Sequence, residues 1–292
     1  MTVRRLTVLV MASLLLPSDV LAGGQGQVPP QQPGWGPWVI PNPFQPLPLP
    51  ALPEAPPMAL PSAVPAGAPV VLELFTSEDC AACESAEFEI HRLMTQPVAG
   101  ARLIPLAFHV EFYGGSASTD PYVLPAATRR QQTYDAARGR VYTPQAIVDG
   151  DTEFGGADDA RARAAITAAT RQPKVSVEVS RGVRLVGPAA LALSVRYAGS
   201  GRRGATLSVA LAEGGLELLH HGGLTAYDRT PLTPVVRALQ ELGAASPSGG
   251  SLETTVAIPP GAVRSNVTAV VLLQDASSHR ILGVGTLPAG VL

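Results

Sequence analysis

The feature that most constrains this chain is a pair of cysteines, Cys80 and Cys83, at the junction of an expected strand and an expected helix. They are the only two cysteines among 292 residues. The apolar run Val70–Phe75 precedes them, and the apolar periodicity of Cys83–Met94 predicts a helix after them. A Cys-x-x-Cys pair at such a turn is typical of thioredoxin-like redox sites.

The short spacing between the two cysteines favours a role in redox chemistry over a structural role. A disulfide across two residues closes a very small loop and removes little entropy from the unfolded chain. A helix N-terminus stabilises a thiolate through its free N–H groups and its dipole. We therefore expect Cys80 to be the attacking thiol, and Cys83, one turn into the helix, to be the buried resolving thiol.

The N-terminus resembles an export signal. Arg4 and Arg5 form a basic start, Leu6–Leu16 is apolar, and Val20-Leu21-Ala22 resembles a cleavage site, which predicts a signal peptide over residues 1–22. Export to the periplasm or the extracellular space would allow a disulfide to persist. No later apolar run reaches transmembrane length, so we expect no stable membrane insertion after cleavage.

Residues 23–68 predict a disordered linker, because they are rich in Pro and Gly and almost free of charge.

The composition of the chain excludes a typical nucleic-acid binder. The formal net charge is −2, Lys174 is the only lysine, and no basic stripe is visible.

Residues 69–172 predict a thioredoxin-like α/β domain with the order β-α-β-α-β-β-α. Asp120-Pro121 has the pattern of an N-cap followed by proline at the first helical position, and it predicts the start of the second helix. Asp149-Gly150 predicts a hairpin turn. The expected elements are strands 70–75, 101–112, 145–148 and 152–154, and helices 83–94, 121–138 and 159–169.

Residues 173–292 predict a mainly β, sandwich-like C-terminal domain. Short runs of alternating apolar residues are separated there by Gly, Ser and Pro. Thr233–Leu242 is the one segment in this part with a helical pattern. The expected strands are 175–179, 190–197, 206–212, 252–258, 267–274 and 281–284.

Two further segments suit a redox dithiol. Thr143-Pro144 enters an expected strand, and a cis-proline there would face the dithiol, with the Thr143 backbone pairing with a substrate chain. Glu73, within the strand before the cysteines, is a candidate proton relay to Cys83, although a solvent-facing position is an equal alternative.

Acidic residues surround the dithiol, and they bear on its redox poise. Nearby negative charge raises a thiol pKa and disfavours the thiolate. A poorly stabilised reduced form implies a stable disulfide, so we expect a reducing or intermediate poise. The acidic residues are Glu78, Asp79, Glu84 and Glu87.

A metal site is a weaker interpretation of the same residues. Cys80 and Cys83 with His109, at the end of the second expected strand, could bind Cu(I) or Zn²⁺. The chain has no second Cys-x-x-Cys, so no metal is favoured and no cofactor is expected.

Several motifs together resemble the bacterial exported family known as domain of unknown function 1223. The resemblance implies a thioredoxin-like fold over about residues 70–169 and names no substrate. This sequence departs from the family pattern in having Asp79 before the first cysteine and Glu84-Ser85 after the second. The matching motifs are Glu73-Leu-Phe-Thr-Ser77, Cys80-x-x-Cys83, Ala107-Phe-His-Val110, Thr128-x-Arg130-Gln131-x-x-Tyr134 and Val141-Tyr-Thr-Pro-Gln145.

These observations favour an exported protein that exchanges thiols and disulfides with a protein substrate or redox partner through Cys80 and Cys83. The alternative is a non-enzymatic binding or interaction protein whose dithiol is a permanently oxidised remnant. The third reading is Cu(I) or Zn²⁺ binding through the two cysteines and His109.

Overall fold

The computed structural model describes residues 67–111, 119–184, 186–219 and 229–288. The predicted signal peptide and nearly all of the predicted linker lie outside these residues. No helix of the described part is long and apolar enough to cross a membrane.

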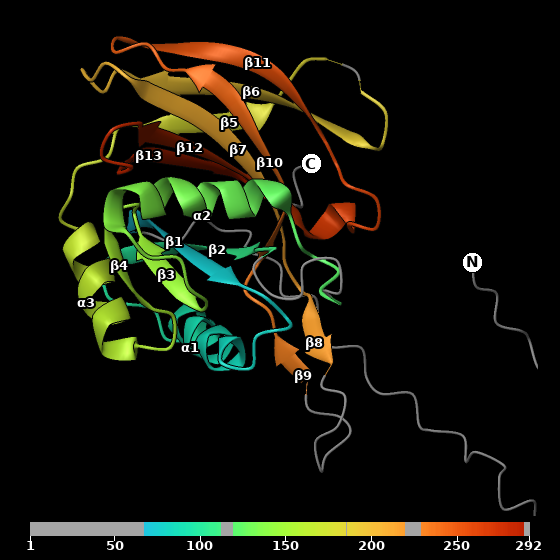
Figure 1. Cartoon of the computed structure of the whole chain (residues 1–292). Helices are drawn as coiled ribbons and strands as arrows, with labels where there is room; N and C mark the ends of the chain where they lie inside the picture. Colours follow the sequence, from blue (N-terminus) through green and yellow to red (C-terminus); the bar gives the residue numbers. More distant parts are fainter. Residues whose placement is uncertain (1–66, 112–118, 185, 220–228, 289–292) are drawn as a thin grey trace, which may run out of the picture. The chain divides into compact units, whose positions relative to one another are not determined.

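The elements up to residue 169 largely follow the predicted order (Figure 1). The Asp149-Gly150 hairpin turn lies between β3 and β4, as predicted. The elements are β1 Ala68–Thr76, α1 Cys83–Thr95, β2 Ala101–His109, α2 Pro125–Arg138, β3 Gln145–Val148, β4 Thr152–Gly155 and α3 Asp159–Ala169.

The rest of the described chain is β-rich, as predicted, with one short 3-10 helix at Arg264–Asn266. Its strands are β5 Val177–Arg181, β6 Ala190–Ala198, β7 Ala205–Glu213, β8 Glu217–Leu219, β9 Arg229–Pro231, β10 Val235–Ala244, β11 Gly249–Ala257, β12 Val267–Asp275 and β13 Ile281–Leu287.

The predicted fold class, a thioredoxin-like α/β domain followed by a separate β-sandwich-like domain, is wrong. Strands from both halves of the chain form one mixed eight-stranded sheet in the order β13-β12-β7-β10-β2-β1-β3-β4. A second sheet, β11-β6-β5, and a two-stranded sheet, β8-β9, complete the described part, which contains only three α-helices. The molecule is therefore mostly β, and its two halves share a sheet.

Strand β10 joins the halves, and it occupies the segment whose pattern predicted a helix. Val235 pairs with Ala107 of β2 in a parallel register, and the Ala107 N–H donates to the Pro234 carbonyl at 2.9 Å. On its other side β10 pairs with β7 along most of its length. The pairing with β7 satisfies backbone groups along β10, the pairing with β2 is confined to Val235, and this tertiary pairing overrides the helical pattern.

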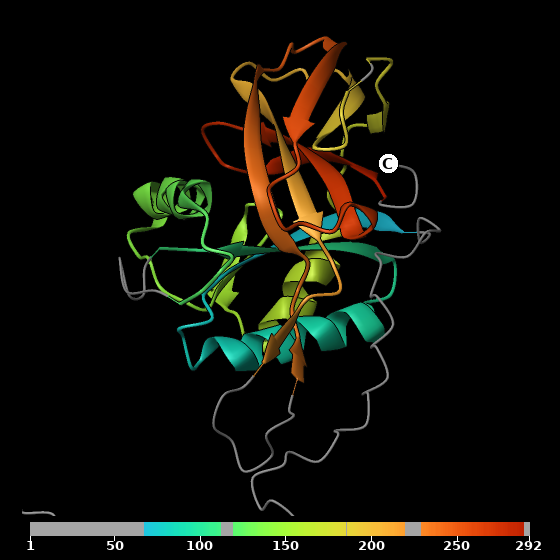
Figure 2. The same cartoon turned by 90° about the vertical axis from the view of Figure 1, so that its right-hand side faces the viewer.

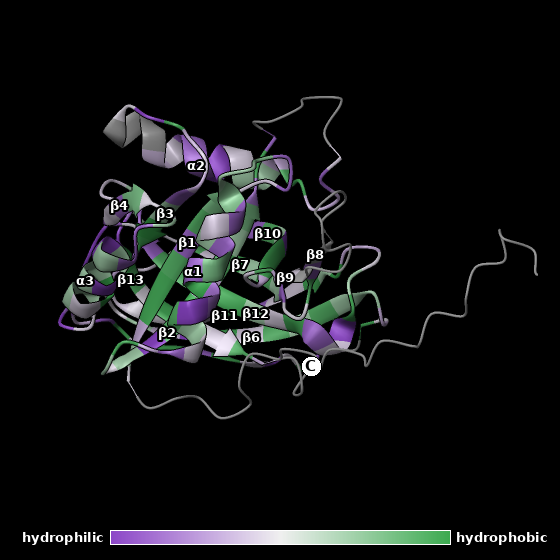
Figure 3. Cartoon of the chain, turned by 90° about the horizontal axis from the view of Figure 1, so that it is seen from below, coloured by the Kyte–Doolittle hydropathy of each residue, from purple (hydrophilic) through white to green (hydrophobic). Residues whose placement is uncertain are grey.

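Four apolar clusters lie in the described part, the smallest around Ala107, Leu232 and Val235, and the three larger ones hold these layers together. One packs α1 and α3 against β1, β3 and β4, and another packs α2 against the strands on the opposite side. The third lies between the second sheet and strands β7, β12 and β13. Figure 2 shows α1 and α2 on opposite sides of the central strands, and Figure 3 shows the apolar character of strands such as β1. The dithiol segment thus follows β1, an interior strand of the eight-stranded sheet.

Candidate functional site

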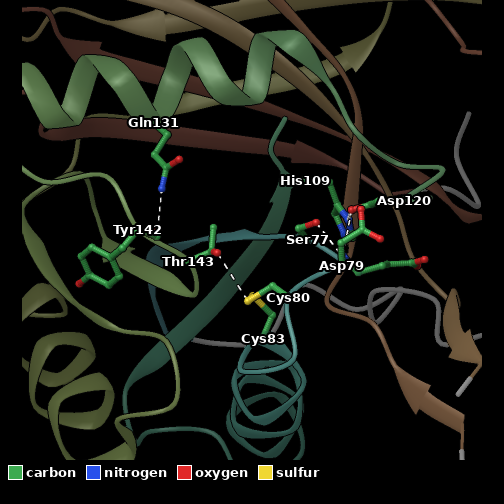
Figure 4. The surroundings of a disulfide bond; sticks show 10 residues. Ser77, Asp79, Cys80, Cys83, His109, Asp120, Gln131, Tyr142 and Thr143 are labelled. Carbon is green, nitrogen blue, oxygen red and sulfur yellow. Dashed lines mark hydrogen bonds and ion pairs between the residues drawn. A yellow bond between two sulfur atoms is a disulfide. The ribbon is translucent and has the colours of Figure 1, made fainter. Parts of the chain in front are cut away.

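Cys80 and Cys83 form a disulfide at the N-terminal end of α1 (Figure 4). Strand β1 ends at Thr76, and the Cys80 N–H donates to the Ser77 carbonyl at 3.1 Å, so a tight turn brings the cysteines to the helix. Only 7% of Cys80 and 2% of Cys83 is exposed. Cys80 is therefore the more exposed of the two cysteine residues, as expected for an attacking thiol.

The Thr143-Pro144 segment lies against the disulfide. Its peptide bond is cis, as predicted, and the Thr143 hydroxyl donates to Cys80 Sγ at 3.5 Å. Gly156 allows this close packing, because a Cβ there would lie 2.9 Å from the Ala86 Cβ of α1 and 3.1 Å from the Pro144 Cβ. The dithiol and the Thr143-Pro144 segment, which the sequence predicted to face each other, are therefore in contact.

A cavity of about 230 Å³ opens beside the disulfide. Residues from the β1–α1 turn, α1, the end of β2 and the segment after β9 surround it. Its lining comprises Thr76, Ser77, Glu78, Cys80, Ala81, Cys83, Glu84, Glu87, His109 and Leu232. Three of the four predicted acidic residues, Glu78, Glu84 and Glu87, therefore share one space with both cysteines, and so does the predicted His109.

His109 is held in place by the buried carboxylate of Asp120, the residue that the sequence predicted to cap the second helix. Helix α2 begins at Pro125, and Asp120 instead accepts a hydrogen bond from His109 Nδ1 at 2.8 Å. Asp120 also accepts the backbone N–H groups of Glu78 and Tyr122, each at 2.9 Å. The more distant ring nitrogen of His109, Nε2, is buried and has no hydrogen-bond partner in the described part of the protein.

The Asp120 carboxyl is kept ionised by this environment. Burial alone would raise its pKa, but the hydrogen bond and charge of His109 and the two backbone N–H groups bring the pKa below its usual value. A charged Asp120 fixes the orientation of the His109 ring.

Glu87 is a buried acid in the same cavity. It is 2% exposed and lies one helical turn after Cys83, on the same face of α1. Its Oε2 accepts the Thr233 N–H at 2.6 Å, whereas Oε1 has no hydrogen-bond partner among the described residues. Burial raises the pKa of Glu87, which favours its neutral, protonated form.

A model of one protein family matches residues 71–274, which is most of the chain. That family is described as "Protein of unknown function (DUF1223)". The chain belongs to the DUF1223 family. The resemblance seen in the sequence motifs is therefore confirmed, and it covers the dithiol, the Thr143-Pro144 segment and most of the β-rich half.

Solved structures similar to this DUF1223 protein include protein AGR_C_4864 from Agrobacterium tumefaciens. The TM-score is 0.57 at 25% sequence identity, over 77% of this chain and 96% of that one. HBP35 of Porphyromonas gingivalis gives a TM-score of 0.56 at 12% identity, over 77% and 76% of the two chains, and this likeness concerns the fold alone. No curated protein gives a significant match.

Glu73, the predicted proton relay, is not brought to the cysteines in this DUF1223 protein. Its buried carboxylate binds the Arg130 guanidinium, with Arg130 Nη2 donating at 2.9 Å and the Tyr134 hydroxyl donating at 2.7 Å. Arg130 also contacts Gln274 of β12 at 3.2 Å. None of the described hydrogen bonds joins Glu73 to a cysteine, and its contacts join β1, α2 and β12.

A metal ion has no ready site in the oxidised form that the structure describes. Within the residues that the structure describes, no group of three or more His, Cys, Asp or Glu side chains is arranged to hold one. The cysteine sulfurs are bonded to each other, and His109 is the one predicted partner that shares their cavity.

Sequence reasoning missed Asp120, Leu232 and Thr233 as parts of this site. Asp120 follows His109 by eleven residues, and the separation gives no local signal that the two side chains meet. Leu232 and Thr233 come from the β-rich half, and only the pairing of β10 with β2 brings them to the cavity. Glu87 was included in the acidic group, but solely as a source of charge.

The stability of the DUF1223 protein should depend on pH through Glu87. The pKa of Glu87 is raised in the folded state. The contribution of Glu87 to stability is therefore fully present below its unfolded-state pKa, and it is lost as pH rises through its folded-state pKa. Glu87→Gln cannot ionise, so it should lose less unfolding free energy than wild type between acidic and neutral pH. Urea unfolding at both pH values measures the difference, with Glu89→Gln, whose carboxylate pairs with Arg92, as the control. Equal pH dependence in wild type and Glu87→Gln would contradict the prediction.

Proposed function

We propose that this chain is an exported protein that exchanges thiols and disulfides with a protein or peptide partner through Cys80 and Cys83. The observation that carries the proposal is the position of the disulfide: a helix N-terminus bordered by the Thr143 hydroxyl and by a cavity that holds a buried acid. A thiolate that forms at a helix N-terminus is stabilised by the free N–H groups there.

The exchange begins when a partner thiolate attacks Cys80 Sγ. A bond forms between the partner sulfur and Cys80, the Cys80–Cys83 bond breaks, and its electron pair stays on Cys83. A second thiolate of the partner then attacks the partner sulfur in the mixed disulfide. The bond to Cys80 breaks, and Cys80 is released as a thiolate. The partner is oxidised and the dithiol is reduced, and the reverse sequence reduces a partner disulfide.

The Thr143 backbone supports partner binding in this scheme. The Thr143 hydroxyl contacts Cys80 Sγ, and an extended partner segment could pair with the Thr143 backbone by main-chain hydrogen bonds. The acidic side chains of Asp79 and Glu84 near the dithiol disfavour thiolates, so we infer a reducing or intermediate poise.

The low exposure of both sulfurs favours a second candidate function, a binding or interaction protein with a permanently oxidised disulfide. In that case Cys80 and Cys83 would stay bonded in the presence of partner thiols, and the β-rich half would carry the binding.

Trapping of mixed disulfides separates the two candidates. Cys83→Ala removes the resolving thiol, so a peptide containing one disulfide should remain attached to Cys80. Mass spectrometry should find one adduct per chain, which dithiothreitol releases. The control, Cys80→Ser with Cys83→Ala, should form none, because the chain has no other cysteine. Absence of adducts in Cys83→Ala would support the binding protein instead.

A further inference from the structure

The cavity beside the disulfide has polar groups without partners, which is unusual for a protein interior. Glu87 Oε1 and His109 Nε2 are both buried, and neither has a hydrogen-bond partner among the described residues. Both residues line the same space as Cys83. A space of about 230 Å³ with such groups is polar and large enough to hold water, which transfers protons readily.

The chemistry of the disulfide creates a need for a proton at this place. When the Cys80–Cys83 bond opens, the electron pair remains on Cys83, which is 2% exposed. A thiolate on so buried a residue is costly unless a proton reaches it. A buried acid within one helical turn could supply that proton, and Glu87 is such an acid.

We propose that Glu87 exchanges a proton with the Cys83 sulfur, through the cavity that both line, each time the disulfide opens or closes. This role rests on the proposed function. On opening, protonated Glu87 gives its proton to the Cys83 thiolate and becomes a carboxylate. On closing, the carboxylate takes the proton of the Cys83 thiol, and the resulting thiolate attacks Cys80 Sγ in the mixed disulfide. The Cys80–Cys83 bond forms, and the bond to the partner breaks with its electron pair on the partner sulfur. Closing thus restores the protonated acid, so Glu87 is a carboxylate while the dithiol is reduced and protonated while the disulfide is closed.

The surroundings of Glu87 suit this exchange. The Thr233 N–H holds Oε2, so that Oε1 is left for the cavity. Burial raises the pKa of Glu87, and burial also raises the pKa of Glu78, a half-buried acid that lines the same cavity. The titratable groups around Glu87 are Glu84 and His91 on α1, Glu78 after β1, and His109 at the end of β2.

The test measures how fast a thiol opens the disulfide of the full chain at a series of pH values. Oxidised protein is mixed with dithiothreitol and quenched, free cysteines are counted by mass spectrometry, and each rate is divided by the concentration of reagent thiolate. In the wild type the normalised rate should fall as rising pH removes the Glu87 proton. In Glu87→Gln it should be independent of pH and about 10-fold or more lower at acidic pH.

The amide of Glu87→Gln keeps an acceptor for the Thr233 N–H and avoids the cost of a buried charge, so the variant should fold. Glu89→Gln, on another face of α1, should keep the wild-type profile. A merely structural role for Glu87 would change stability without changing the shape of the pH profile.

Two failures can be told apart. If Glu87→Gln opens with the wild-type profile while exchange itself proceeds, the role of Glu87 is rejected and the proposed function stands. If the wild-type disulfide exchanges no faster than a free Cys-Ala-Ala-Cys peptide, the proposed function is rejected and this role falls with it.

Infrared difference spectra of the wild type provide a check without a variant. Reduction should change the band of a protonated carboxyl, and an unchanged carboxyl region would overturn the proposal.

Discussion

Cys80→Ser should lower the rate of thiol–disulfide exchange by about 10²-fold or more, to the uncatalysed level. The attacking sulfur is removed, and Cys83, 2% exposed, cannot be reached by a partner in its place. The rate is measured by insulin reduction and by oxidation of a dithiol peptide, with the same protein concentration in each assay.

The control for this variant is Ser85→Ala, an exposed position on the same helix, which should exchange at the wild-type rate. Cys80→Ser should retain the wild-type circular dichroism, since the change is nearly isosteric. Wild-type exchange by Cys80→Ser would exclude a nucleophilic role for Cys80.

Arg130→Met should lower the unfolding free energy by about 3–5 kcal/mol. The Glu73 carboxylate, fully buried in β1, would lose its charged partner and remain with the Tyr134 hydroxyl. Arg130 also reaches Gln274 of β12, so the change loosens the contact of α2 with both halves of the sheet. Urea unfolding at neutral pH measures the loss.

Two variants sharpen this prediction. Arg129→Met changes the exposed neighbouring arginine and should cost within about 0.5 kcal/mol. Arg130→Met combined with Glu73→Gln removes both charges and should recover part of the loss, because no unpaired buried charge remains. A cost for Arg130→Met no larger than that for Arg129→Met would show that the pair contributes nothing to stability.

Local patterns in the sequence predicted most elements and the central pair of the candidate site. The strand before Cys80, the helix after Cys83 and the Asp149-Gly150 turn all depend on interactions between near neighbours. The cysteines and Thr143 were also expected to meet, because a known type of site combines them.

Those local patterns could not predict pairing between segments that are distant in the sequence. Nothing near Val235 indicates that it will pair with Ala107, so the shared sheet was missed and the segment was assigned to a helix. Asp120-Pro121 has the local pattern of a helix start, but the nearby His109 provides a stronger partner for the carboxylate. In both places a tertiary contact outweighs the local preference.

The insertion of β10 beside β2 also has a consequence for the order in which the molecule is assembled. Synthesis proceeds from the N-terminus, so Cys80 and Cys83 emerge well before β10 and the Thr233 N–H that covers Glu87. Pairing between such distant strands is slow, because the intervening chain must first be ordered. The two cysteines are therefore made before the pocket is complete, and the late arrival of β10 determines how long they stay without it.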